Sequence, residues 1–315
     1  AKPTILDLVE ETVDVALSEY ICRCLSGGQI RVLSLRQCRI SDDSLAFVLT
    51  NLAYSKVATL NLTLGTIDSS RKIKQLTKYL PKSHVTNLSL HGSPLTSRHL
   101  QHLLPSLLAL PTLASLDLGD CNLTDDCAAA LSRHLLSSST SGMSTSLACL
   151  ALSGNADISS SGWCRIFLAI GLLPSLRDLR LDFTRLGDEG VRQLAILLAG
   201  GTCGLRCLDL DSCGITDDGA ATLIFLLENF SISVGRISLA ENEQISQQSL
   251  GAIASLLAAQ RARHRVAEGV EETDFEDNDD DGEENGLGAS DDWTVVSDLG
   301  ASGATAVDEM PSFRG

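Results

Sequence analysis

One pattern of apolar residues recurs along most of this 315-residue chain and constrains its fold more than any other feature of the sequence. The segment 113–136 shows it most clearly, with strand-like alternation followed by helical spacing at Leu113, Leu116, Leu118, Leu131 and Leu135. One such unit cannot bury its own apolar face, whereas stacked copies can. The sequence therefore predicts a solenoid built from strand and helix units around one continuous core.

Eight copies of the pattern follow one another. Successive copies are offset by 27 to 34 residues, and their strands are expected to start at Ile30, Val57, Val85, Leu113, Leu147, Leu176, Leu205 and Val234. This spacing lies at the long end of the range for leucine-rich repeats, where each repeat carries a full helix. We therefore expect an α/β leucine-rich repeat solenoid, a right-handed horseshoe with a parallel sheet on its concave side and helices outside.

Charge divides the chain into parts. From Glu268 onward there are 16 acids and a single base, Arg314, so this stretch has a net charge of -15 and leaves about -1 of the total of -16 for the rest. Such a composition is typical of disorder. We predict an N-terminal capping unit at 1–29, with a helix through Val13, Leu17 and Ile21, then eight repeats at 30–266 and a disordered acidic tail at 267–315.

The near-neutral repeat region is expected to have no basic stripe, which argues against nucleic acid as the main partner. Three of the ten cysteines, Cys38, Cys121 and Cys213, occupy one repeat position after the strand, where Asn155 and Asn242 stand in two other repeats. This periodicity indicates buried free thiols, and with no signal peptide in view it favours a reducing cytoplasm. No apolar run approaches the roughly 18 residues that a membrane span needs.

Catalytic motifs are not evident. The sequence has no phosphate-binding glycine loop, no His-Glu-x-x-His and no Cys-x-x-Cys pair. His99 and His102 could share a helix face as metal ligands, but a third ligand is not evident, and packing or rim histidines are the simpler interpretation. We predict no enzymatic activity, no cofactor and no metal site.

Acidic residues gather on the predicted concave face, in the C-terminal half of the array. Residues between the buried leucines should stand in rows across successive strands, where leucine-rich solenoids bind partners. The predicted protein-binding patch consists of Asp117, Asp120, Asp178, Asp182, Asp209 and Asp211, with Phe183 as an apolar anchor beside it. Two interpretations stay open: a merely solvated face, or a docking patch by which a monomeric scaffold binds a protein with a basic surface.

The tail contains one island of aromatic and aliphatic residues, Ser290 to Val296. Trp293 and Val296 are three residues apart, and Asp291 and Asp292 precede them, which resembles the Atg8-family interacting motif of selective-autophagy receptors. In that motif the two apolar side chains fill two pockets while the peptide adds a strand to the partner. The alternatives are another docking motif, an intramolecular contact with the horseshoe, or no role.

Four strings that the repeat does not demand are LNLTLGTIDSSRKIKQL at 60–76, LHGSPLT at 90–96, LDLGDCNLTDD at 116–126 and LAEN at 239–242. With them the chain resembles, over roughly residues 20 to 260, the vertebrate leucine-rich repeat-containing protein 73 family of the ribonuclease-inhibitor-type superfamily. The resemblance implies a non-enzymatic repeat protein associated with cilia, and supplies no catalytic or ligand residues. Ran GTPase-activating proteins are similar in architecture alone, a horseshoe with an acidic tail, and that alternative would make Arg71 a rim-loop arginine near a GTPase.

Overall fold

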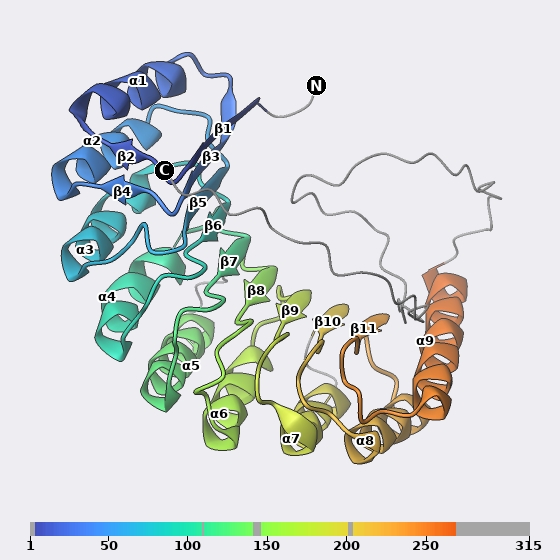
Figure 1. The fold of residues 1–315 in the computed structure, drawn as a ribbon. Coiled ribbons are helices and arrows are strands. Elements are labelled where there is room, and N and C mark those ends of the chain that lie inside the picture. Colours follow the sequence, from blue (N-terminus) through green and yellow to red (C-terminus); the bar gives the residue numbers. More distant parts are fainter. Residues whose placement is uncertain (1–3, 109, 141–145, 201–203, 269–315) are drawn as a thin grey trace, which may run out of the picture.

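A computed structural model describes residues 4–108, 110–140, 146–200 and 204–268. Within them one parallel sheet of nine strands lines the inside of a horseshoe, and helices form its outer layer (Figure 1). The strands, in spatial as in chain order, are β1 (Thr4–Val9), β3 (Ile30–Arg36), β5 (Thr59–Thr63), β6 (Asn87–Ser89), β7 (Ser115–Asp117), β8 (Cys149–Ala151), β9 (Asp178–Arg180), β10 (Cys207–Asp209) and β11 (Arg236–Ser238).

Each strand is followed by a helix. The helices are α1 (Val15–Ser26), α2 (Asp42–Leu52), α3 (Ser70–Tyr79), α4 (Ser97–Leu108), α5 (Asp125–Thr140), α6 (Ser160–Ile170), α7 (Gly187–Ala199), α8 (Asp217–Asn229) and α9 (Gln247–Glu268). A short 3₁₀ helix, η1 (Leu80–Lys82), extends α3. The predicted fold class is confirmed, because alternate residues of each strand and the turn after it, such as Leu116 and Leu118 at 1% and 0% exposure, form one continuous core with the helices.

The N-terminal segment contributes more than a cap. Strand β1 pairs with β3 in the same parallel sense as the other strands, so that Leu6 and Leu8 lie beside Leu33 and Leu35. A second small sheet joins β2 (Thr12–Val13) to β4 (Arg39–Ile40). The prediction that Val13 belongs to the first helix is therefore wrong.

Helix α1 starts after Asp14, whose carboxylate caps it by accepting the N–H of Leu17 at 2.8 Å. An aspartate at this position satisfies a free N–H group of the first turn and fixes where the helix begins.

Acids in the first turn of a helix also cap the next helix along the array. Asp188 of α7 accepts the N–H of Thr216 at 2.8 Å, its hydroxyl at 2.7 Å and the N–H of Gly219 at 3.0 Å, all at the start of α8. A Cβ atom added to Gly219 would lie 2.4 Å from the same carboxylate, which explains the small residue there. Asp125 and Asp217 make corresponding bonds to Ser159 and Ser246.

Buried polar side chains tie the turns after the strands to one another. The Asn155 amide oxygen accepts the N–H groups of Cys121 and Leu123 at 3.2 and 3.0 Å, and its nitrogen donates to the carbonyls of Leu118 and Leu152 at 3.0 and 2.8 Å. Asn155 itself is fully buried. One side chain therefore satisfies backbone groups of two successive repeats.

The three cysteines at the same repeat position are buried, and each donates its thiol to a carbonyl of the preceding repeat. The Sγ to O distances are 3.4 Å for Cys38 to Leu8, 3.3 Å for Cys121 to Leu90 and 3.1 Å for Cys213 to Leu181. Burial raises the pKa of Cys121 to about 12, so this thiol stays neutral and structural. Over the part of the chain that the structure describes, no helix is both long and apolar enough to cross a membrane.

Candidate protein-binding surface

The concave face consists of side chains in register across the sheet. Strand pairing places one row along Asp7, Ser34, Asn61, Ser89, Asp117, Ala151, Arg180, Asp209 and Ser238. This is the predicted row, extended by Asp7 from β1. Neighbouring members are one strand spacing apart, about 4.8 Å, so charges on successive strands act on one another directly.

Rows on either side hold the other predicted acids. Asp178 lies between Cys149 and Cys207 in the row two residues before the first one. Asp182 and Asp211 lie in the row two residues after it, and their carbonyls accept the N–H groups of Gly154 and Phe183, both at 2.9 Å. The structure therefore places the predicted patch on one face of the sheet, with Asp117 and Asp120 on the β7 side and the other four acids on β9, β10 and the turns after them, beyond β8.

One to three residues beyond the end of each strand of the large sheet, one residue has a left-handed backbone with φ between +50° and +70°. This feature recurs in every repeat, at Glu10, Gln37, Leu64, Gly92, Asp120, Gly154, Phe183, Ser212 and Glu241. The N–H groups of the first eight donate to carbonyls of the next repeat at 2.7–3.0 Å. A non-glycine residue in this conformation is uncommon and costs energy, so the ladder of hydrogen bonds must hold it there.

Two of the predicted site residues belong to this row of left-handed turns, which fixes the orientation of their side chains. Asp120 and Phe183 are both exposed, and Phe183 as a residue is 58% exposed to solvent. Because the left-handed turn is fixed by the neighbouring repeat, both side chains are presented from a rigid backbone. Rigid presentation lowers the entropy lost on binding.

Two of the acids also serve the fold. Asp117 accepts the Ser89 hydroxyl at 2.7 Å and the N–H of Gly119 at 2.9 Å. Asp211 receives the Ser238 hydroxyl at 2.6 Å and the N–H of Ala240 at 2.7 Å, both on Oδ1. These carboxylates stabilise the sheet face as well as charging it.

The electrostatics of Asp117 follow from its neighbours. Burial raises its pKa, but contacts with His91, Ser89 and the N–H of Gly119 outweigh burial and hold the pKa below the ordinary value. The same contact raises the pKa of His91, although burial opposes that change. His91 Nδ1 lies 3.8 Å from the Asp117 carboxylate, so the pair favours the charged form of each partner.

The pKa of Asp209 changes in the opposite direction. Burial, followed by the charges of Asp182 and Asp211, raises its pKa to about 6. Asp182 itself accepts the Ser153 hydroxyl. The patch is not purely acidic, because Arg180 lies in the row of Asp209 and lowers its pKa.

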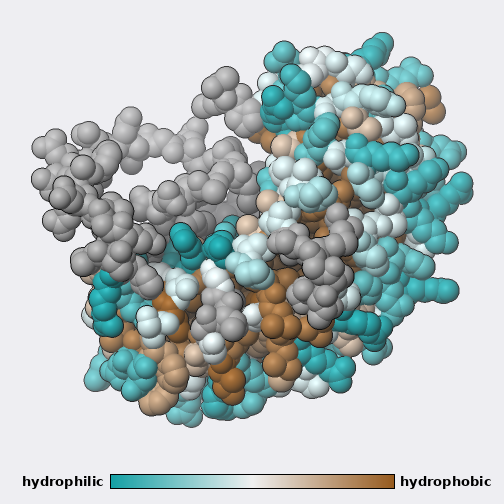
Figure 2. Space-filling view, turned by 180° about the vertical axis from the view of Figure 1, so that it is seen from behind, coloured by the Kyte–Doolittle hydropathy of each residue, from teal (hydrophilic) through white to brown (hydrophobic). Residues whose placement is uncertain are grey.

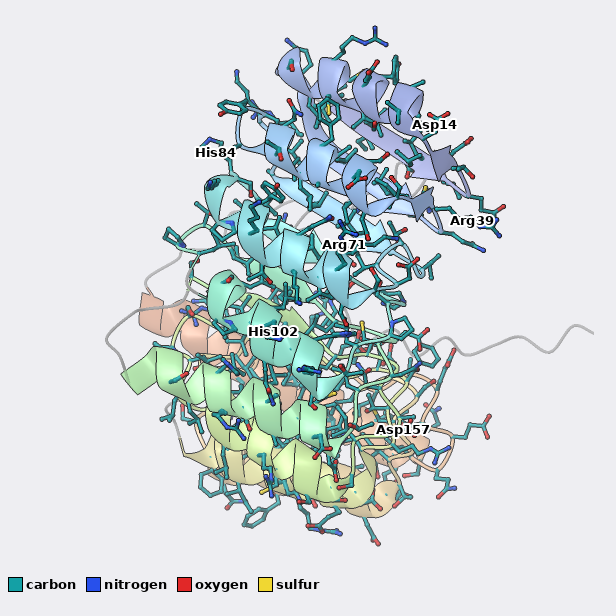
Figure 3. All side chains as sticks on the ribbon, turned by 90° about the vertical axis from the view of Figure 1, so that its left-hand side faces the viewer. Asp14, Arg39, Arg71, His84, His102 and Asp157 are labelled. Atoms are coloured by element: carbon teal, nitrogen blue, oxygen red, sulfur yellow. The ribbon has the colours of Figure 1, made fainter. Side chains whose placement is uncertain are left out.

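The expectation that the repeat region has no basic stripe is wrong, because a basic strip lies on the outer face. Its exposed members lie on α3, η1, α4 and the turn between them: Arg71, Lys74, Lys78, Lys82, His84, Arg98 and His102. Figure 3 shows Arg71 and His102 on the outer side of adjacent helices. The signal was present, because no Asp or Glu occurs between residues 69 and 116.

The remaining candidates are placed as follows. Arg71 lies in the first turn of α3, with Nε 3.4 Å from the Asp42 carboxylate, so it belongs to a helix and not to a rim loop. His99 Nε2 lies 2.7 Å from the Ser70 hydroxyl. The tail residues Asp291, Asp292, Trp293 and Val296 lie outside the described residues.

Comparison with known proteins agrees with the repeat pattern. A profile of the family described as Leucine Rich repeat matches residues 109–132, 173–195 and 204–223. Leucine-rich repeat-containing protein 73 from Homo sapiens is 36% identical over 273 residues, which cover 86% of this chain and 85% of that protein, and the Rattus norvegicus protein matches equally.

A solved structure of the Rad7 and Elc1 complex in yeast matches 76% of this chain and 56% of that chain, with a TM-score of 0.51 and 18% identity. At this level of identity the likeness concerns the fold alone.

Proposed function

The chain belongs to the family of leucine-rich repeat-containing protein 73, and from that membership and the geometry of its concave face we propose a non-enzymatic interaction scaffold. It binds a protein with a basic surface through the acidic half of the sheet. The predicted patch of six aspartates and Phe183 supplies the contacts, and the chain acts as a monomer.

The observation that carries this proposal is the row of left-handed turns. It fixes Asp120 and Phe183 at the edge of the sheet, next to Asp182 and Asp211 in the adjoining row. Aromatic side chains, Phe among them, are enriched at protein interfaces. In this arrangement the carboxylates steer a basic partner and raise its association rate, while Phe183 supplies apolar contact.

Neutralisation of the patch tests the proposal. Asp120, Asp182 and Asp211 are changed together to Asn, because Asn tolerates a left-handed backbone and its Oδ1 keeps the hydrogen bonds that Asp182 and Asp211 accept there. A matched control changes three exposed acids of the outer helices, Asp43, Asp126 and Asp218, so that net charge changes equally.

Proteins captured from a cell extract by the parent chain are identified and their association rates measured at low and high salt. We expect the concave variant alone to lose much of the rate at low salt. If both variants capture the same partners at the same rates, the patch is solvated surface only.

The tail supports a second contact of the same scaffold. The spacing of Trp293 and Val296, with Asp291 and Asp292 before them, fits a motif that adds a strand to an Atg8-type protein. A peptide of residues 286–300 is titrated against such a protein. Roughly micromolar affinity that Trp293→Ala with Val296→Ala abolishes is the expected result, whereas equal binding by the double variant contradicts it.

The place of action is part of the proposal. The family resemblance favours association with cilia, and the periodic free cysteines favour the cytoplasm. A fluorescently tagged full chain in ciliated cells is expected to concentrate at cilia above a cytoplasmic background. Uniform staining with no ciliary enrichment would remove the ciliary part of the proposal.

A further inference from the structure

Helices α7 and α8 form an apolar groove on the outer layer. It encloses about 540 Å³ and is lined by Ile196 and Ala199 from α7 and by Phe225 and Phe230 at the end of α8, with Arg192 at its edge. The rings of Phe225 and Phe230 meet edge to face with centroids 6.3 Å apart. Ile196 and Phe225 are 75% and 60% exposed, so this groove leaves large apolar side chains open to solvent.

The neighbouring helix α6 also exposes large apolar side chains. Leu168 on α6 and Leu172 just after it are 67% and 49% exposed. Figure 2 shows apolar residues gathered on the lower back of the molecule, on the side of α6, α7 and α8. The outer face of α3 is basic instead, so the fold itself does not require apolar residues here. Large exposed apolar surface of this kind usually marks a contact.

We propose that the tail segment Trp293 to Val296 of the same chain occupies this groove. The segment is the only aromatic and aliphatic cluster in a stretch of 47 residues that is otherwise rich in acids, from residue 269 to 315. Trp293 supplies a ring for the edge-to-face pair of phenylalanines, and Val296 supplies an aliphatic group for Ile196. Aromatic contacts of this kind add to the gain from burial alone.

The part of the tail between α9 and Trp293 is long enough to reach the groove. Trp293 follows the end of α9 at Glu268 by 25 residues. A flexible segment of this length has a root-mean-square span of about 25–30 Å. Neighbouring helices pack about 8–10 Å apart, so the groove between α8 and α7 lies roughly 10–20 Å from α9. A linker whose span is close to this separation gives an effective concentration in the millimolar range, on the order of that for short flexible linkers.

Opposite charges also favour the docking of this tail segment in the groove. Asp291 and Asp292 precede Trp293, and the groove has Arg192 at its edge. Arg192 pairs with Glu189 at 3.0 Å and keeps half of its side chain exposed, so a second carboxylate can approach the guanidinium. Such an exposed pair adds little affinity but orients the peptide.

Docking would regulate the tail. While Trp293 lies in the groove it is hidden from any other partner, so the full chain binds a partner of the motif more weakly than the free peptide does. The docking itself does not depend on either proposed partner. Its test therefore fails or succeeds separately from theirs.

Tryptophan fluorescence of the full chain provides the test. The chain has two tryptophans, and Trp163 is fully buried in α6. The difference between the spectra of the parent chain and a Trp293→Phe variant isolates the emission of Trp293. We expect that emission to lie to the blue of the emission of peptide 286–300, and its quenching by acrylamide to be several-fold weaker.

Changing Ile196 to Asp or Phe225 to Ser should make Trp293 behave as in the peptide. Both residues are exposed, so circular dichroism should show an unchanged fold. The matched control is Phe47→Ser on α2, 45% exposed and far along the array, which should leave Trp293 protected. Peptide-like emission in the parent chain, protection that survives both groove variants, or protection that rises with protein concentration would each overturn the proposal.

Discussion

At the scale of single residues, Asp209 is an acid whose charged form the fold disfavours. Burial and the nearby Asp182 and Asp211 raise its pKa to about 6. An aspartate with a raised folded pKa binds its proton more tightly when folded. The contribution of Asp209 to the free energy of unfolding is therefore greatest below its unfolded pKa, near 4. It falls as the pH rises through the folded pKa of about 6, and it stays lower above that.

Asp209→Asn is accordingly expected to stabilise the protein at pH 7.5. The side chain is only partly buried and solvent screens it, so we expect a gain of about 1 kcal/mol, well below what the full shift implies. The amide oxygen can still accept the N–H of Asp211. Urea unfolding at pH 7.5 and pH 4 measures the effect, and the gain should vanish at pH 4. Identical unfolding free energies at pH 7.5 would contradict the assignment.

Asn155 is a residue whose loss should cost much stability for its size. Its amide makes five hydrogen bonds to backbone groups of two repeats, and truncation to Ala leaves buried groups without partners. We expect a loss of about 2–4 kcal/mol in the free energy of unfolding. The matched control is Asn51→Ala, which removes one bond to the Phe47 carbonyl near the surface. Equal losses for the two variants would rule out the bridging role.

At the scale of elements, the leucine spacing predicted eight strands and their helices, because burial every second residue fixes strand register. Strand β1 was not predicted, although Leu6 and Leu8 precede Leu33 and Leu35 by 27 residues. The turn position of that first copy holds Glu11, where other repeats have a buried Cys, Ser, Thr or Asn. Without the buried turn residue the copy looked like a cap.

The candidate site was predictable in part. The concave rows follow from strand register and could be written from the sequence. The left-handed row could not, because its members share no side-chain chemistry; only Gly92 and Gly154 hint at the conformation. The basic strip was missed because the charge was summed over the whole repeat region, where acids elsewhere balance it.

The caps between repeats give a prediction for a single helix. Asp188→Ala removes three hydrogen bonds at the start of α8, and we expect it to lower the free energy of unfolding by about 1–2 kcal/mol. Asp218→Ala, in the first turn of α8 itself, serves as the control because it removes only a favourable charge at the helix start, worth a few tenths of a kcal/mol. Denaturant titration compares the two, and a larger loss for Asp218→Ala would refute the cap.

At the scale of the whole molecule, the repeat array combines surfaces of different chemistry. Acids occupy the concave side of the later repeats, bases the outer side of α3 and α4, and apolar side chains the outer side of α6 to α8. Each surface recurs over neighbouring repeats, because one position of the repeat always lies on the same face. A solenoid can therefore carry separate contacts without any change to its core.

The same construction predicts how the molecule unfolds. Each repeat packs only against its neighbours, so stability is close to a sum of repeat and interface contributions. Leu150→Ala in the fifth repeat should cost about 2–5 kcal/mol and weaken two interfaces, since β8 lies between β7 and β9. Leu239→Ala makes the same chemical change in the last described repeat, beside β10 alone.

Native-state hydrogen exchange followed by mass spectrometry separates the outcomes. The amides of Asp120, Gly154 and Phe183 report the bonds between repeats, at 2.7, 2.9 and 2.9 Å. Leu150→Ala should accelerate exchange on both sides of β8, whereas Leu239→Ala should accelerate it near β11 and leave the amides of Asp120 and Gly154 protected. Equal acceleration along the whole array in both variants would mean that the repeats unfold as one unit, because a local loss then lowers the stability of every interface together.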